Sequence, residues 1–223
     1  ISKITKIAVT GGKSSDLKDS YNNIPIIKIN EVDAIGHGAI ALYNIGNKPF
    51  VAVSAGTGTA CIYHNNGLFT HLGGISVGGG TLLGLTKHLI NNKNPNDIHQ
   101  LAKKGNRKKL DFLIGDVVNK IGSLYPEITA SNFAKAKDNE NLLSEDIAAS
   151  ISNMIGEVIG TISYLNAMIC NENKVYFLGR VSLNDVIRSG IEDRLGLAKI
   201  NGLFEENREY GNVLGTLSCI QTK

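Results

Sequence analysis

Three short apolar runs joined by tight turns, at 50–54, 58–63 and 67–71, constrain the fold of this chain more than any other feature. β-Branched residues are common in these runs, as they are in the strands of a half-buried sheet. An Asn-Asn-Gly sequence at 65–67 separates the last two runs, and such a sequence is typical of a two-residue hairpin turn. The sequence therefore predicts an antiparallel three-stranded meander.

The elements expected after the meander indicate an α/β chain. Helices are expected from Gly78 and from about Asp97, and the apolar residues at 110, 113, 117, 118 and 121 have the spacing of a third helix. Ser144 is expected to cap a long helix. The order then continues with a strand at 174–178, a helix at 183–195, a strand at 198–204 and a helix at 212–220. This succession resembles a ribonuclease H-like domain, with a mixed sheet flanked by helices.

The residues before the meander are expected to belong to a second domain. Runs at 4–9 and 24–29 are strand-like, and helical spacing begins after Glu31, where a strand hands over to a helix. Two ribonuclease H-like domains that face a cleft resemble the actin-like fold, and α/β proteins place chemistry at such strand ends.

We therefore expect two domains. Residues 1–49 are expected to be the C-terminal remnant of an N-terminal actin-like domain. Residues 50–223 are expected to form a C-terminal domain with a helical insertion at about 92–145. Because the chain begins at Ile1 and its first methionine is Met154, we expect an N-terminal truncation that leaves the first domain incomplete.

Charge and cysteine content exclude several classes of protein. The 23 basic and 20 acidic residues nearly balance, and the basic run at 103–109 has no interleaved aromatic residues, so we expect no nucleic acid partner. Polar residues interrupt the longest apolar helix, so we expect no membrane partner. Three widely spaced cysteines indicate reduced thiols and a cytoplasmic location. No metal ligand is assigned, because the histidines show no paired ligand spacing.

Two glycine-rich turns are the strongest signal of function. The first, Val-Ser-Ala-Gly-Thr-Gly-Thr-Ala at 53–60, places backbone N–H groups and hydroxyls where they can converge on an anion. The second, at 78–81, opens a helix, whose N-terminus favours phosphate. An ordinary glycine hairpin and a flexible hinge are the structural alternatives. Since the two turns follow each other closely, we expect them to share a cleft that suits a triphosphate.

The run from Val53 to Leu85 resembles the type II pantothenate kinases through its Gly-Thr-Gly-Thr, Leu-Gly-Gly and Gly-Gly-Gly-Thr-Leu-Leu-Gly-Leu sequences. Further segments similar to that family follow in matching order at 10–12, 31–34, 178–179 and 210–215. The resemblance covers nearly the whole chain. It implies transfer of the γ-phosphoryl group of ATP to the primary hydroxyl of pantothenate, the first step of coenzyme A biosynthesis, with Mg²⁺ as the charge partner. It also implies a homodimer.

The turns and the resemblance together give a set of candidate nucleotide-binding residues. They are Ser54, Gly56, Thr57, Gly58, Thr59, Gly78, Gly79, Gly80, Thr81 and Gly179. Arg180 follows the last of them and could stack on adenine or lie on the surface.

Glu31 matches the general base of the family. A carboxylate at a strand end can accept the hydroxyl proton as the phosphoryl group transfers. The structural alternative is a surface glutamate that caps the following helix. Asp33 is the second choice of base, because similar Asp-Ala pairs occur at the sugar-binding turn of N-acetylglucosamine-type kinases.

His71, Gly73, Thr129 and Ala130 are the candidate contacts to the acceptor substrate. The pair at 129–130 resembles the family segment near the pantothenate pocket and the dimer interface. His71 departs from the family, whose best-known members carry an arginine at this point. Histidine is shorter and lacks the bidentate fork of arginine, so the identity of the acceptor stays open.

Two alternative functions remain open at this stage. One is an amino-sugar or other small-metabolite kinase of the same superfamily, because a fold alone does not name a substrate. The other is a nucleotide-binding regulatory ATPase module without a small acceptor. The family places an Asp-x-Gly-Gly-Thr turn ahead of the present Ile1, so the chain as given is expected to be inactive or nearly so.

Overall fold

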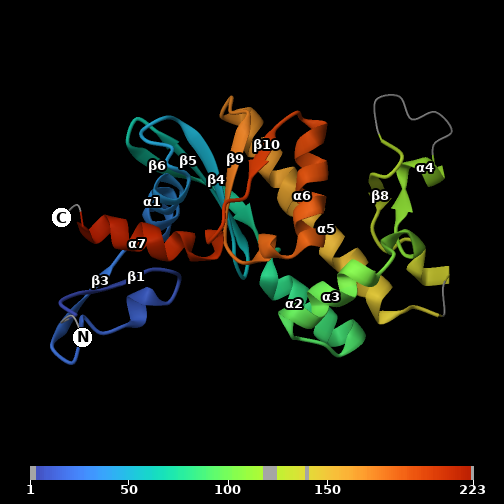
Figure 1. Cartoon of the computed structure of the whole chain (residues 1–223), viewed down its shortest axis with the longest axis horizontal. Helices are drawn as coiled ribbons and strands as arrows, with labels where there is room; N and C mark the ends of the chain where they lie inside the picture. Colours follow the sequence, from blue (N-terminus) through green and yellow to red (C-terminus); the bar gives the residue numbers. More distant parts are fainter. Residues whose placement is uncertain (1–3, 118–124, 139–140, 222–223) are drawn as a thin grey trace.

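A five-stranded mixed sheet forms the centre of the molecule (Figure 1). The computed structural model describes residues 4–117, 125–138 and 141–221. The strands of this sheet are β4 (Phe50–Ala55), β5 (Thr59–Asn65), β6 (Leu68–Ile75), β9 (Lys174–Leu178) and β10 (Asn201–Leu203). They lie in the order β10-β9-β4-β5-β6, with β4, β5 and β6 antiparallel and β4, β9 and β10 parallel. The predicted meander and the ribonuclease H-like order are confirmed.

The turn between β5 and β6 shows why the meander could be predicted. Asn66 and Gly67 occupy it with φ angles of 51° and 80°. Two successive residues with positive φ define the type I′ turn, whose twist matches that of the flanking strands. The Asn-Gly pair therefore fixes the register in which Asn65 faces Leu68.

Helices cover both faces of the sheet, so that all six residues of β4 are buried. One face carries α5 (Ser144–Ile169) and α6 (Asp185–Leu197), with α2 (Gly79–Ile90) and α3 (Pro95–Lys104) at its edge. The other face carries α1 (Glu31–Tyr43), which packs against α7 (Gly211–Gln221). Val51 and Val53 point into the first layer, whereas Phe50 and Ala52 point into the second, as the period of two in a strand requires.

A small second sheet precedes α1, with β1 (Ile7–Val9), β2 (Ser20–Tyr21) and β3 (Ile24–Lys28) in the order β1-β3-β2. It lies at the lower left of Figure 1, where β1 contacts α7. The helix α1 packs on the five-stranded sheet rather than on this small one. The domain boundary at residue 49 stays a prediction. The helix α1 precedes that residue but packs on the core of the five-stranded sheet.

Closely packed glycines hold the helix pairs together. A Cβ added at Gly215 of α7 would overlap the carbonyl oxygen of Ala34 and the nitrogen of Gly38, both in α1. On the other face, a Cβ at Gly156 of α5 would overlap the carbonyl oxygen of Ile187 in α6. In each pair the backbones of the two helices are in direct contact. A residue larger than glycine at these positions would prevent that contact. Among the described helices, none has the length and apolar content that crossing a bilayer requires.

The third helix predicted at 110–121 is wrong in its described part. Phe112–Leu113 forms the short strand β7, which pairs with β8 (Thr129–Ser131), and only Ile114–Val117 is helical, as α4. Pairing with β8 overrides the helical spacing, and the Leu113 N–H donates to the Asp116 carboxylate at 2.9 Å instead of to a preceding turn. The positions after 117 in the predicted helix lie outside the described residues.

Most other element boundaries differ from the predictions by a few residues. Ser144 is not the N-cap of α5, because Leu143 takes that position without a side-chain cap. Asp146 in the first turn instead accepts hydrogen bonds from the Asn106 N–H at 2.7 Å and the Lys109 ammonium at 2.8 Å. The remaining short elements are 3₁₀ turns at Ser14–Asp16, Arg107–Lys109, Ala136–Asp138, Val181–Leu183 and Arg208–Tyr210.

Replacing Tyr43 by Phe is expected to lower the free energy of unfolding by about 1–3 kcal/mol, the usual cost of leaving buried partners unpaired. The Tyr43 hydroxyl lies 2.6 Å from the Phe177 carbonyl oxygen and 2.8 Å from that of Leu203, so it ties α1 to the ends of β9 and β10. Urea unfolding of both proteins measures the difference. Equal stability would show that the hydroxyl makes no net contribution.

The same contact predicts a dependence on alkaline pH. Burial raises the pKa of Tyr43 from 10.0 to about 12. Since the folded state favours the protonated phenol, this contribution is complete below pH 10 and is lost as the pH rises towards 12. The free energy of unfolding of the Tyr43→Phe protein should therefore fall less over this interval than that of the native protein.

Candidate functional site

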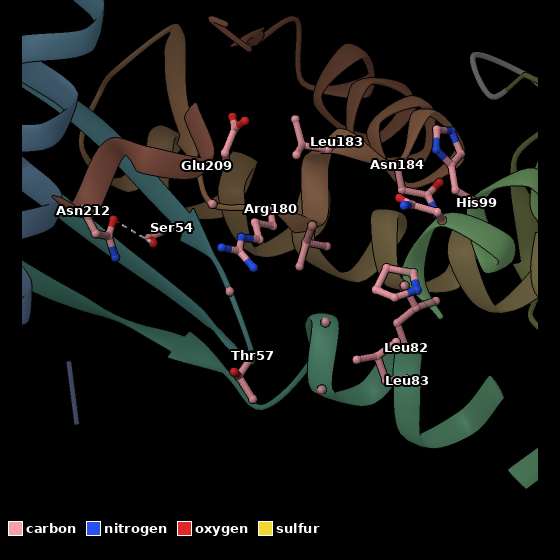
Figure 2. A pocket seen from close by; sticks show the side chains of 17 residues that line it. Ser54, Thr57, Leu82, Leu83, His99, Arg180, Leu183, Asn184, Glu209 and Asn212 are labelled. Carbon is pink, nitrogen blue, oxygen red and sulfur yellow. Dashed lines mark hydrogen bonds between the residues drawn. The ribbon is translucent and has the colours of Figure 1, made fainter. Parts of the chain in front are cut away.

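A pocket of about 780 Å³ lies where the end of β4, the start of α2 and the segment after β9 meet (Figure 2). Its wall combines backbone-exposing glycines, small hydroxyl side chains, amides and leucines. The lining residues are Ser54, Gly56, Thr57, Gly79, Gly80, Leu82, Leu83, Pro95, Asn96, His99, Gly179, Arg180, Val181, Leu183, Asn184, Glu209 and Asn212. A cavity of this volume, lined by both polar and apolar residues, can hold a ligand as large as a nucleotide.

The two glycine turns predicted from the sequence meet at one end of this pocket. The Gly79 N–H donates to the Gly56 carbonyl at 2.8 Å, and the Gly80 N–H donates to the Thr57 carbonyl at 2.9 Å. A Cβ at Gly78 would stand only 2.8 Å from the Thr57 carbonyl oxygen. The turns are thus bonded directly to each other, and glycine permits the close approach.

This bonding corrects one part of the sequence interpretation. The N–H groups at the start of α2 were expected to face an anion, whereas those of Gly79 and Gly80 donate to the first turn. Their carbonyl partners satisfy two of the helix N-terminal donors that a phosphate would otherwise take. The part of the first turn that lines the pocket is Gly56 and Thr57, and Ser54 of β4 lines the pocket beside them.

The candidate nucleotide-binding residues therefore divide into two sets. Six of them line the pocket: Ser54, Gly56, Thr57, Gly79, Gly80 and Gly179. The other four, Gly58, Thr59, Gly78 and Thr81, are not in its lining. Thr59 donates to the Val77 carbonyl at 2.8 Å and Thr81 to the Ser76 carbonyl at 3.3 Å, so both hydroxyls brace the segment between the turns.

Gly179 forms part of the pocket wall beside the end of β4, next to the first glycine turn. Its φ of +93° lies in the left-handed region, and an added Cβ would stand 2.7 Å from the Ala55 carbonyl carbon. The tight bend follows directly on β9, beside the end of β4. Arg180, the next residue, points into the middle of the space in Figure 2.

Asn212 closes the pocket at the end of β4. The Ser54 hydroxyl donates to the Asn212 side-chain oxygen at 3.2 Å, which links β4 to the start of α7. The sequence motif at 210–215 contained Asn212, but no role was assigned to it. Glu209 also lines the pocket and was not predicted.

The opposite end of the pocket is built from α3 and the start of α6. His99 of α3 lies 3.2 Å from the carboxylate of Asp185, and the Lys103 ammonium lies 2.9 Å from the same carboxylate. The hydrogen bond from Lys103 holds the pKa of Asp185 below its ordinary value. These contacts join α3 to α6 beside Asn184, another lining residue that the sequence interpretation missed. An Asn just before a helix is an N-cap signal, which would have marked its position.

Glu31 and Asp33 are not in the lining of the pocket. Both are exposed in the first turn of α1, and the cap of that helix is Asn30, whose side chain accepts from the Val32 N–H at 2.8 Å. The structural alternative of a surface glutamate that caps the helix is therefore right about the surface position and wrong about the cap, which is Asn30. The role of Glu31 as a base stays a prediction.

The candidate contacts to the acceptor also lie outside the pocket. His71 and Gly73 lie on β6, where His71 is exposed. Thr129 is buried on β8, where its hydroxyl oxygen accepts from the Arg107 guanidinium at 2.8 Å, and Ala130 is exposed. Gly73 pairs with Cys61, two residues after the nucleotide candidate Thr59 in β5, but none of the four lines the pocket.

Comparison with known proteins decides the family. A sequence model of the Fumble family matches residues 39–188. The chain is 36% identical over 191 residues to a type II pantothenate kinase of Bacillus cereus, an alignment that covers 81% of this chain and 68% of that protein. The chain belongs to the Fumble family of type II pantothenate kinases. A protein of Arabidopsis thaliana named pantothenate kinase 1 is 36% identical over 141 residues, 59% of this chain and 37% of its own.

Solved structures show the actin-like fold of this Fumble-family chain. Component A of the (R)-2-hydroxyglutaryl-CoA dehydratase of Acidaminococcus fermentans superposes with a TM-score of 0.62 at 18% identity, over 94% of this chain and 73% of that one. The activator of the 2-hydroxyisocaproyl-CoA dehydratase of Clostridium difficile, solved with bound ADPNP, gives 0.62 at 16% identity, over 98% and 77%. A ROK family glucokinase of Streptomyces griseus, solved with glucose and AMPPNP, gives 0.56 at 12% identity, over 91% and 70%.

The Fumble match covers only some of the candidate site residues. Residues 39–188 contain the glycine turns, α2, α3 and Asn184, whereas Glu31 and Asn212 lie outside the matched range. The roles of the nucleotide candidates and of Glu31 stay predictions, and six of the ten nucleotide candidates line the pocket.

Proposed function

We propose that this protein is an ATP-dependent kinase that transfers a phosphoryl group to the primary hydroxyl of pantothenate. The observation that carries the proposal is the 36% identity, over most of the chain, to proteins named type II pantothenate kinase. The pocket of about 780 Å³ supports it, because its glycine turns and hydroxyls lie where a triphosphate can approach the backbone closely.

The nucleotide would lie along the pocket, with its phosphates by the turn around Thr57 and its base towards α3. Ser54 and Thr57 supply hydroxyls there, and Arg180 supplies a positive charge in the middle. In phosphoryl transfer the protein contributes mainly positioning and electrostatic stabilisation. We propose these roles for the lining residues and a supporting role for Thr59 and Thr81.

Mg²⁺ would arrive with ATP and screen its phosphate charge. The ion usually keeps several waters and takes phosphate oxygens with one or two carboxylates, rather than a dedicated protein cage. Among the described residues no group of three potential ligands is gathered. We therefore propose that the ion binds through the nucleotide, and we assign no protein ligand to it.

For the acceptor we propose Glu31 as the base, with His71, Gly73, Thr129 and Ala130 as contacts. A homodimer would bring residues of two copies together at one site. Its support is the exposed apolar face near the end of α5, where Leu165, Met168 and Ile169 are 43%, 60% and 80% exposed. We place the protein in the cytoplasm, on the basis of its reduced thiols.

The test is ADP release by the full-length protein with Mg-ATP, comparing pantothenate with a panel of amino sugars. We expect release with pantothenate alone, and a product heavier by one phosphoryl group in mass spectrometry. Release with an amino sugar alone would assign the acceptor to the sugar class. ADP release that ignores every acceptor would identify a regulatory ATPase instead.

A further inference from the structure

The pocket wall around Arg180 is made of two segments that lie far apart in the sequence. Residues 179–183 follow β9, residues 209–212 lead into α7, and both segments contribute to the lining (Figure 2). Arg208 lies directly before the second segment. It is 9% exposed and is not itself in the lining. Any effect of Arg208 on a ligand in the pocket must therefore pass through the residues that it holds.

The guanidinium of Arg208 joins these two segments. Its Nε donates to the Ser182 hydroxyl and its Nη2 to the Ser182 carbonyl, both at 2.9 Å, while its Nη1 donates to the Glu205 carbonyl at 2.9 Å. In the other direction, the Gly179 N–H donates to the Arg208 carbonyl, also at 2.9 Å. Ser182 is fully buried in the 3₁₀ turn Val181–Leu183, whose two outer residues line the pocket. The turn is thus bonded to the start of α7 through one side chain.

Stability alone does not explain an arginine at this position. The three bonds of the guanidinium go to uncharged oxygens, which do not offset its charge. A charge buried in this way is costly, and an apolar side chain of similar volume is often at least as stabilising. What arginine provides is a rigid planar fork, which can bond two atoms of one residue and a third atom on another segment at once. The geometry of the turn is therefore what Arg208 determines.

We propose that Arg208 is a positioning residue for the nucleotide: it holds the turn Val181–Leu183 against the start of α7 and thereby sets the pocket wall on which ATP packs. This inference rests on the proposed use of ATP. A wall that is in place before the ligand arrives supports tighter binding than one that must first be ordered, because ordering it would consume part of the binding free energy. The expected signature is a change in nucleotide affinity with an unchanged chemical step.

The test starts from Arg208→Lys, which keeps the charge but not the fork. A lysine ammonium is a point charge and does not reproduce the planar set of bonds to Ser182 and Glu205. We expect this variant to bind ADP about tenfold more weakly in calorimetry, the usual scale for hydrogen bonds made by a charged group. Binding is measured at a temperature at which circular dichroism shows both proteins to be folded.

Arg188→Lys is the matched control. Arg188 lies over the same Phe204 ring as Arg208, with its Cζ 4.8 Å from the ring centroid as against 5.9 Å. Its Nε donates to the Glu192 carboxylate at 2.9 Å, and it is not in the pocket lining. The control makes the same exchange beside the same ring without touching the turn, so ADP binding should change by less than about twofold.

Ser182→Ala tests the route through the turn by a smaller change. It removes one of the two Ser182 acceptors and leaves the backbone carbonyl in place, so ADP should bind about threefold more weakly. In the Ser182→Ala background, Arg208→Lys should weaken binding by clearly less than tenfold, because the two residues act through one contact. Effects of the two substitutions that simply multiply would overturn the inference.

Kinetics of the full-length protein separate positioning from a merely structural role. Arg208→Lys should raise the KM for Mg-ATP about tenfold and leave kcat within about twofold, since Arg208 is outside the lining and acts on binding alone. A lower melting temperature with unchanged ADP affinity, or a fall in kcat at unchanged KM, would overturn the inference and leave the kinase proposal intact. A native protein that binds no ADP would overturn both.

Discussion

In the full-length protein, Glu31→Gln is expected to lower the kcat of pantothenate phosphorylation by roughly 10²- to 10⁴-fold, the usual contribution of a general base. Glutamine keeps the size of the side chain but cannot accept the proton of the hydroxyl. The affinity for ATP should change by less than about twofold, because Glu31 is exposed at the start of α1 and does not line the pocket. Steady-state kinetics and direct binding of ADPNP measure the two quantities.

Asp33→Asn provides the matched control for this prediction. Asp33 lies two residues further along the same turn and is also exposed, so its replacement changes the same charge on the same helix end. We expect nearly native turnover in Asp33→Asn. Turnover retained in Glu31→Gln but lost in Asp33→Asn would transfer the role of base to Asp33, and loss of ADPNP binding in Glu31→Gln would show a structural role instead.

Local signals made the central sheet and the position of the pocket predictable. The Asn-Gly turn fixed one hairpin because its two positive φ angles suit few other residues. The glycine turns indicated a phosphate site through the close backbone approach that glycine alone permits, and the structure brings them together at one pocket.

Features that depend on distant partners could not be predicted. The segment around Leu113 has helical spacing, but its pairing with β8 comes from residues well over ten positions away. The N–H groups of Gly79 and Gly80 face the first turn because that turn lies directly beside them, which the spacing of glycines does not reveal. Asn184 was missed for the same reason, since its place in the pocket wall depends on segments that are distant in the sequence.

Replacing Gly215 by Ala is expected to lower the free energy of unfolding by about 3 kcal/mol, at the upper end of the usual cost of overpacking. The new Cβ would overlap the Ala34 carbonyl oxygen and would stand 2.9 Å from its carbon, so α1 and α7 would have to move apart. Backbone atoms cannot adjust as a flexible side chain does. Because α1 carries Glu31 and α7 carries Asn212, the same separation would displace the proposed base from the nucleotide pocket.

Gly84→Ala is the control for this substitution. Gly84 is also helical, but an added Cβ there meets nothing within 4 Å, so the change should stabilise the protein by about 0.5–1 kcal/mol through backbone entropy. Urea unfolding of the two variants should therefore shift in opposite directions. If Gly215→Ala instead gained stability as Gly84→Ala does, the close crossing of α1 and α7 would be wrong. The argument that packing against α7 holds Glu31 in position relative to the pocket would then fail as well.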